Sequence, residues 1–176
     1  LRESFLNLLG YNQEQVIDQQ NDQTKRLSRL SKKHVLIAED NMVNQMVIKG
    51  MLKKLKVSFD IAGDGVEAFD NIKQHHEKYD AVLMDCEMPN MDGYDATTAI
   101  RSWEKEHNKH SVPIIALTAH AMKERLDKAI TSGMNDHLAK PMEIEGLRNC
   151  LETHILDSTN EEDEDAPQLA RAEKKS

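Results

Sequence analysis

The sequence has few cysteines and no long apolar run. Cys86 and Cys150 are the only cysteines among its 176 residues, and neither has a partner at a metal-binding spacing. Two isolated thiols predict free cysteines in a reducing compartment. No apolar stretch approaches the roughly 18 residues of a membrane span, and no secretory signal is evident. We therefore expect a cytoplasmic segment without direct membrane contact. Because Leu1 rather than Met opens it, we expect it to be a piece of a longer chain.

Motifs for nucleotide hydrolysis and for zinc proteases are missing as well. The chain contains no Walker G-x-x-x-x-G-K-[ST] and no HExxH. Its histidine pairs, His75 with His76 and His107 with His110, are expected to be solvated. The charge is also one-sided, because 31 acidic residues against 23 Lys and Arg give a formal charge of −8. That balance argues against nucleic acid or an anionic membrane as the main partner, since either would repel the chain.

Composition divides the chain into three parts. Residues 1–32 combine five glutamines with a basic cluster and little apolar periodicity, which predicts a polar, helical linker without a coiled-coil seam. Residues 157–165 contain six acids in nine positions, so we expect a disordered tail over 157–176. The remaining segment, 33–156, is long enough for one domain.

The hydrophobic pattern of the middle segment alternates between strand and helix. Short continuous apolar runs at 35–38, 81–84 and 112–117 predict parallel strands that are buried on both faces. Residues 57–61 alternate apolar and polar, as an edge strand does, and 137–139 form a fifth candidate. Helical stripes lie between and after these runs, at 43–55, 66–72, 96–103, 122–130 and 144–155. This alternation predicts a doubly wound α/β fold, a flavodoxin-like (βα)5 parallel sheet in the strand order 2-1-3-4-5.

Charged and polar residues stand at the carboxyl ends of four of the predicted strands. Glu39 and Asp40 end the first strand, Asp85 the third, Thr118 the fourth and Lys140 the fifth. Each alone has an ordinary explanation, such as a helix cap for Asp40, but in this fold the strand ends meet in one crevice. Three carboxylates together call for a cation, and Mg²⁺ is the natural one. With a lysine and a hydroxyl, the set indicates phosphoryl transfer to an aspartate.

These residues lie in four segments that resemble a known family, the receiver domains of two-component signalling. The segments are VLIAEDNMVN at 35–44, AVLMDCEMPNMDG at 81–93, PIIALTA at 113–119 and GMNDHLAKP at 133–141. The resemblance covers about residues 33–156. Its details, especially EDNMVNQ and ALTAHAM, are most similar to receivers attached to hybrid sensor histidine kinases, and we expect a bacterial one.

The resemblance implies a role for each residue of the predicted site. Asp85 would be the phosphoacceptor. Asp40 and Asp85 would bind Mg²⁺ through their carboxylates, Glu87 through its backbone carbonyl, and Glu39 largely through water. Lys140 would contact the phosphoryl group.

It also implies a conformational switch. Thr118 would be the hydroxyl that moves to the phosphoryl oxygen, and the Lys140–Pro141 bond would be cis. The family's switch aromatic is replaced here by His137. Because an imidazole is smaller than a Tyr or Phe ring and titrates near neutrality, a simple inward and outward swing of an aromatic ring is in doubt.

The expected partners are a histidine kinase domain of the same parent chain and a histidine phosphotransfer domain or protein. One alternative is a pseudo-receiver that is not phosphorylated and regulates a kinase by contact. A less favoured alternative is a dinucleotide-binding domain through Gly63, Gly65 and Ala68. Asp64 argues against it, because its charge would lie where a pyrophosphate should.

Overall fold

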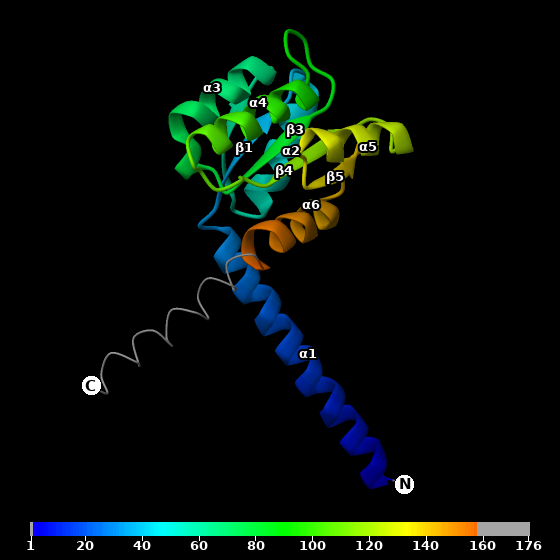
Figure 1. Cartoon of the computed structure of the whole chain (residues 1–176). Helices are drawn as coiled ribbons and strands as arrows, with labels where there is room; N and C mark the ends of the chain where they lie inside the picture. The colour runs from blue at the N-terminus through cyan, green and yellow to red at the C-terminus, as the bar shows by residue number, and fades with distance from the viewer. Residues whose placement is uncertain (1, 158–176) are drawn as a thin grey trace, which may run out of the picture.

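In the computed structural model, residues 2–157 are described, with side chains from residue 16 onward. Five strands alternate with helices along the chain (Figure 1). The strands are β1 (His34–Ala38), β2 (Ser58–Ala62), β3 (Ala81–Asp85), β4 (Ile114–Thr118) and β5 (Asp136–Ala139). The helices are α1 (Arg2–Leu30), α2 (Met42–Lys54), α3 (Gly65–His75), α4 (Gly93–Glu106), α5 (Lys123–Ser132) and α6 (Ile144–Leu151), with the short turns η1 (His76–Lys78) and η2 (Glu152–Leu156).

The strands form one parallel sheet in the order β2-β1-β3-β4-β5. The predicted fold class and strand order are therefore confirmed. The three central strands are almost wholly buried, whereas β2 at the edge is exposed or half-buried at four of its five positions. The difference arises because helices cover both faces of a central parallel strand, whereas an edge strand keeps contact with water.

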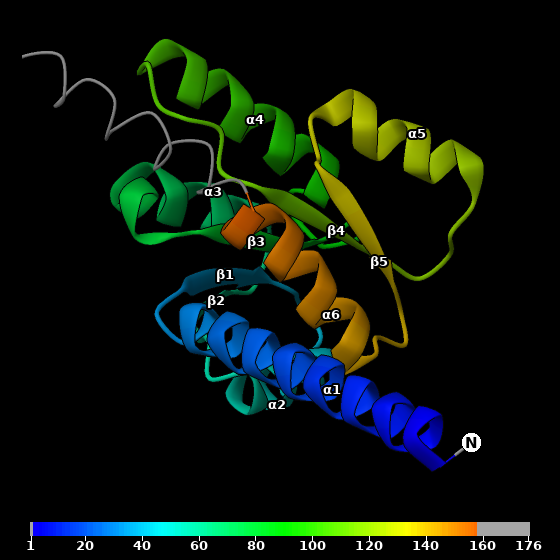
Figure 2. The ribbon, with the colours of Figure 1, turned by 90° about the horizontal axis from the view of Figure 1, so that it is seen from below.

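Helices cover both faces of the sheet (Figure 2). One core lies between the sheet and helices α3, α4 and α5, and includes Ile72 and Ile100. The other lies between the sheet and helices α2 and α6, and includes Leu52 and Leu151. The strand ends are thus held between two packed layers. The loops that follow the strands all project at the carboxyl ends of the sheet.

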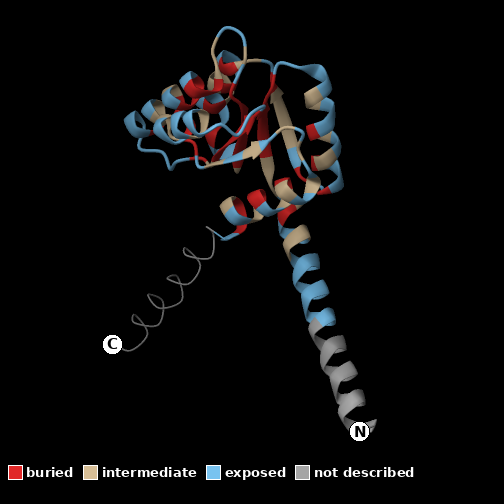
Figure 3. Cartoon of the chain, turned by 90° about the vertical axis from the view of Figure 1, so that its right-hand side faces the viewer, coloured by how far each residue is buried: buried red, intermediate tan, exposed pale blue. Residues whose placement is uncertain are grey.

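Helix α1 reaches the domain only with its last turns. Leu30 is fully buried in the second core and Leu27 packs against it, while the Arg29 guanidinium donates to the carbonyl of Leu156, 3.3 Å away. From there the helix extends away from the sheet (Figures 1 and 3), and its residues 16–25 are exposed. The predicted disordered tail lies, beyond Asp157, outside the described residues. None of the described helices is long and apolar enough to cross a membrane.

Candidate functional site

Three carboxylates meet at the carboxyl ends of β1 and β3. Glu39, Asp40 and Asp85 each place one oxygen within 4.8 Å of the others. Glu39 and Asp85 are buried, at 0% and 6% exposure, whereas Asp40 is exposed. The cluster therefore has a buried floor and an open side facing solvent.

Lys140 neutralises part of this charge. Its Nζ atom lies 2.7 Å from Glu39 Oε2 and 3.2 Å from Asp85 Oδ2. Its backbone N–H donates to the carbonyl of Thr118 at 2.8 Å, which ties β5 to β4 beside the cluster. The following Lys140–Pro141 peptide bond is cis. Burial opposes the charged ammonium, but the hydrogen bond that it donates to Glu39 and the charge of Asp85 outweigh this effect and raise the pKa of Lys140.

The two buried carboxylates respond differently to the same pocket. Burial raises the pKa of Asp85 to about 6; the charge of Lys140 opposes this rise and that of Glu39 adds to it. Burial also disfavours ionised Glu39, but its hydrogen bond from Lys140 and those from the backbone of Asn41 and the side chain of Asn44 lower its pKa. Glu39 is thus the stably ionised partner of Lys140, and Asp85 is the carboxylate with weaker support for its charge.

The loops that carry these residues are fixed by local bonds. The Asn41 side chain accepts from the backbone N–H groups of Val43 and Asn44 and so caps α2. On the other side, the N–H of Gly93 donates to the carbonyl of Cys86 at 3.2 Å. A Cβ atom at Gly93 would clash with the backbone carbonyl of Asp85. Only glycine therefore lets α4 begin against the end of β3.

Thr118 ends β4 with a buried, unpaired hydroxyl. The residue is 1% exposed, and its Oγ1 atom has no hydrogen-bond partner among the described residues. A buried hydroxyl without a partner costs about 1–3 kcal/mol. Such a group is available for a new acceptor that arrives in the pocket.

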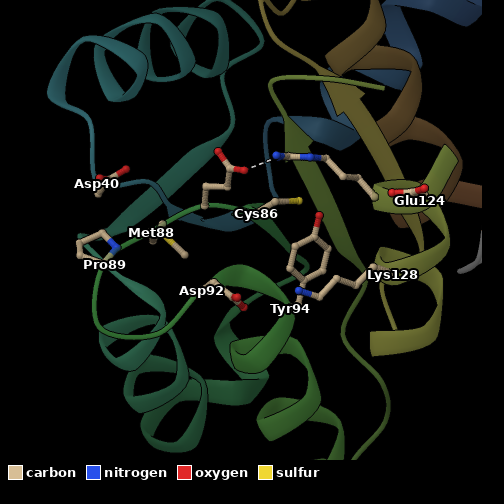
Figure 4. Close-up of a pocket in the computed structure, with 10 residues that line it drawn as sticks. Asp40, Cys86, Met88, Pro89, Asp92, Tyr94, Glu124 and Lys128 are labelled. Carbon is tan, nitrogen blue, oxygen red and sulfur yellow. Dashed lines mark hydrogen bonds and ion pairs between the residues drawn. The ribbon is translucent and has the colours of Figure 1, made fainter. Parts of the chain in front are cut away.

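A cavity of about 620 Å³ opens beside the carboxylates (Figure 4). Asp40 and Cys86 line it on the side of the cluster, and Glu124 and Lys128 line it from α5. Glu87 also lines the cavity and forms an ion pair with Arg125 across it. The sequence pattern did not single out Arg125, because nothing in its helical context marks it as facing another loop.

His137, the predicted switch residue, is exposed on β5. Its Nδ1 atom lies 3.9 Å from Asp136 Oδ1, and it borders a cavity of about 270 Å³ between β5 and α5. The residue is therefore outside the carboxylate cluster, on the flank that includes Leu126 and Ile130.

The donor set fits a hard divalent cation. Three carboxylate oxygens within 4.8 Å of one another are the type of ligand that Mg²⁺ takes, and the exposed side at Asp40 leaves room for the water ligands it keeps. Glu39 makes the shorter contact with Lys140, at 2.7 Å against 3.2 Å for Asp85, so Asp40 and Asp85 are the freer carboxylates. Glu87 is near the same site through its N–H, which donates to Asp85 Oδ1 at 3.3 Å.

The glycine motif at 63–68 is occupied by the chain itself. Asp64 caps α3 through the N–H of Glu67 and accepts from the side chain of Asn90. The N–H of Gly65 donates to the carbonyl of Met91 at 3.1 Å, and a Cβ atom there would clash with that carbonyl. The glycine is thus explained by close packing of the loop between β3 and α4, and this backbone group is not available to a pyrophosphate.

Two further sequence predictions concern single residues. Cys86 and Cys150 are both free, as predicted, and the structure shows that both are buried. The expectation that His76 is solvated is wrong: the residue is 4% exposed, and its Nε2 atom lies 3.0 Å from the buried carboxylate of Glu104. The pattern failed here because His76 follows the last turn of α3 and turns inward where the helical stripe has ended.

Comparison with known proteins agrees with the observed fold. Residues 35–152 match the family model of the response regulator receiver domain. Hybrid signal transduction histidine kinase I of Dictyostelium discoideum is 41% identical over 131 residues, which are 73% of this chain and 8% of that protein. The chain thus spans a small part of the curated relatives, which come from plants, an amoeba, a fission yeast and a bacterium. The bacterial origin stays a prediction.

Two solved structures are similar to this chain in fold. The receiver domain of sensor histidine kinase PA1611 from Pseudomonas aeruginosa, with magnesium in its active-site cleft, has a TM-score of 0.63 and 41% identity, covering 70% of this chain and 97% of that one. The Saccharomyces cerevisiae Ssk1 receiver, crystallised with the phosphotransfer protein Ypd1, has a TM-score of 0.67 and 32% identity, covering 70% and 89%. The chain therefore belongs to the family of response regulator receiver domains.

Proposed function

We propose that this domain accepts a phosphoryl group on Asp85 in a His-Asp phosphorelay. The observation that carries the proposal is the buried Asp85 carboxylate held between Lys140 and the other two acids. The carboxylate would attack phosphorus as the P–N bond of a phosphohistidine breaks. The imidazole leaves with the electron pair of that bond and takes up a proton. An ionised carboxylate needs no general base for this attack, so positioning and charge neutralisation provide the catalysis.

The other residues would each hold one part of the reaction in place. Asp40, Asp85 and the carbonyl of Glu87 would hold Mg²⁺, with Glu39 acting through water. When bound, the ion supplies positive charge against the phosphoryl oxygens. The Lys140 ammonium would move from Asp85 to a phosphoryl oxygen while keeping Glu39 as its buried partner. Thr118 would give its unpaired hydroxyl to another phosphoryl oxygen.

We infer that the domain receives phosphate from, or returns it to, a histidine phosphotransfer protein and a kinase domain of the same cytoplasmic parent chain. Support comes from the hybrid kinase relatives and from the Ssk1 neighbour. The surface beside the site is suitable, because Met42, Val43, Met46 and Val47 of α2 are 47–75% exposed. A cavity of about 90 Å³ beside this surface is lined by Val47, Pro141 and Lys140, the residue that contacts the cluster. An apolar helix face next to a reactive carboxylate suits the docking of another helical protein.

Labelling with acetyl phosphate tests the acceptor. The wild type with Mg²⁺ should take up one phosphoryl group per chain, stable in acid and labile in base, and EDTA should suppress the labelling. Asp85→Asn should abolish it. Asp40→Asn should slow it at least tenfold, because a metal ligand but not the acceptor is lost.

Uptake of the same base-labile label by Asp85→Asn would contradict the assignment. If the wild type is not labelled by acetyl phosphate or by a phosphorylated histidine donor, the domain is a scaffold that acts by contact alone.

A further inference from the structure

A second group of potential metal ligands lies at the other end of the strands, away from the carboxylate cluster. His76 and Glu77 belong to η1, which precedes β3, and His110 belongs to the loop that precedes β4. One ligand atom from each lies within 4.8 Å of the others. Because all strands are parallel, this group is at their amino ends, away from Asp85. The phosphoryl-transfer proposal makes no use of it.

The ring of His76 is fixed by a buried carboxylate. Its Nε2 atom lies 3.0 Å from Glu104 Oε1, and both side chains are 2% exposed. Glu104 also accepts from the N–H of Val112 at 2.9 Å and from the Arg101 guanidinium at 2.8 Å. A carboxylate that accepts from these donors assigns the imidazole proton to Nε2. In the neutral ring, Nδ1 then carries the free lone pair.

That Nδ1 atom is buried and has no hydrogen-bond partner among the residues the structure describes. It lies 3.7 Å from Glu77 Oε1, and His110 Nδ1 lies 3.9 Å from Glu77 Oε2. The rings of His76 and His110 meet edge to face with centroids 4.8 Å apart. The unpartnered nitrogen therefore lies beside the Glu77 carboxylate, which His110 also approaches.

We propose that His76 Nδ1, His110 and Glu77 form a binding site for a divalent transition-metal ion of the Zn²⁺ type. Two imidazoles and one carboxylate are a recurrent zinc ligand set, with water as the fourth ligand. Tetrahedral ligand atoms around zinc are separated by roughly 3.3 Å, as bond lengths of about 2.0–2.1 Å require. Closing the present distances needs movement only of Glu77 and His110, whose side chains are more than 60% exposed.

Glu104 is the positioning residue of this site. A carboxylate that accepts from the second nitrogen of a metal-binding histidine fixes the tautomer and orients the ring. Lys109 is the one cation in contact with Glu77 among the described residues, with Nζ 2.9 Å from Oε1. Because it holds one carboxylate oxygen, the other, which faces His110, is left for the metal. The bound ion would link η1 to the loop between α4 and β4.

Titration calorimetry with Zn²⁺ on the full chain tests the proposal, with millimolar Mg²⁺ present to compete at the acidic cluster. The wild type should bind Zn²⁺ at one site that excess Mg²⁺ does not displace. His110→Ala, at an exposed position, should weaken the binding at least tenfold. His75→Ala is the matched control, an exposed histidine at the same helix end but outside the ligand group, and should bind as the wild type does. Glu104→Gln, checked for folding by circular dichroism, should weaken binding about 10–100-fold.

Side-chain ¹⁵N NMR of the histidines identifies the ligand atom. Zn²⁺ should shift the Nδ1 resonance of His76 and leave Nε2 protonated. Equal Zn²⁺ affinity in the wild type and His110→Ala would overturn the proposal. It would place the ion at the phosphoacceptor cluster or at the group of Asp136, Cys150 and His154. An unshifted His76 ring with bound Zn²⁺, or no binding to the wild type, would overturn it as well.

Discussion

Asp85 and Glu39 share one lysine, yet the pocket has opposite effects on their protonation. Burial raises the pKa of Asp85 from its ordinary 3.8 to about 6. Glu39 has a lowered pKa, because its hydrogen bonds outweigh its burial. The acceptor therefore carries a charge that the metal-free fold disfavours, whereas Glu39 carries one that the fold supports. Glu39 accepts hydrogen bonds from Lys140, Asn41 and Asn44, whereas Asp85 accepts them only from Lys140 and Glu87 among the described residues. This difference in hydrogen-bond donors distinguishes the structural carboxylate from the reactive one.

This contrast predicts that neutralising Asp85 and neutralising Glu39 have opposite effects on the stability of the domain. Between pH 4 and pH 6 folded Asp85 binds a proton that the unfolded chain has released, so the stability contributed by this group falls as pH rises through that window. At pH 7.5 without metal, Asp85→Asn should stabilise the domain by about 1–3 kcal/mol. The gain should vanish below pH 4. Thermal melts in EDTA across this range measure it.

Glu39→Gln is the matched variant, and it should destabilise the domain at pH 7.5 by about 1–3 kcal/mol, because Lys140 loses its closest buried acceptor. If Asp85→Asn lowers the melting temperature at every pH, burial is not what raises the pKa of the acceptor.

At the scale of elements, the sequence predicts the strands and their order. It does not predict the side-chain contacts between segments that are far apart in the chain. Continuous apolar runs at 35–38 and 81–84 identify central strands, because only a strand covered on both faces has no polar positions. Strand ends then locate Asp85 and Lys140. The Glu87–Arg125 pair joins the loop after β3 to helix α5, and no local pattern connects these two segments. The inward turn of His76 has the same origin, since its partner Glu104 comes from another helix.

The segment from Thr118 to the end of β5 is the element that we expect to respond to phosphorylation. A hydrogen bond from the Thr118 hydroxyl to a phosphoryl oxygen is charge-assisted and worth about 1.5–3 kcal/mol. That is enough to shift a two-state equilibrium by one to two orders of magnitude. With Mg²⁺ and beryllofluoride, amide resonances over residues 118–140 should move, and Thr118→Ala should reduce the shifts beyond the first turn of α5.

Amide NMR spectra with and without the phosphoryl mimic make this comparison. If the shifts in the wild type stay confined to residues that touch Asp85, the domain relays phosphate without a conformational switch. His137 should then show no change, which its exposed position on β5 makes easy to observe.

For the whole molecule, the distribution of exposed apolar side chains indicates where a partner binds. Met42, Val43, Met46 and Val47 gather on one face of α2, next to the site. Ile130 on α5 is as exposed, at 71%, but lies on another surface. A single exposed side chain needs no explanation, whereas a cluster beside a reactive group indicates an interface. The arrangement allows docking and chemistry to be separated by mutation.

Val43→Lys and Met46→Lys should lower the rate of phosphoryl transfer between Asp85 and a phosphorylated histidine phosphotransfer protein at least tenfold. A charge in the apolar centre of an interface is desolvated without a partner, which is costly. Labelling by acetyl phosphate should stay unchanged, because a small donor needs no docking surface. Ile130→Lys, a matched apolar-to-lysine change, should affect neither reaction.

Stopped-flow or gel-based assays of phosphoryl transfer from both donors separate the outcomes. Equal losses with both donors would mean that these residues support the site itself, and an equal loss in Ile130→Lys would move the interface to α5.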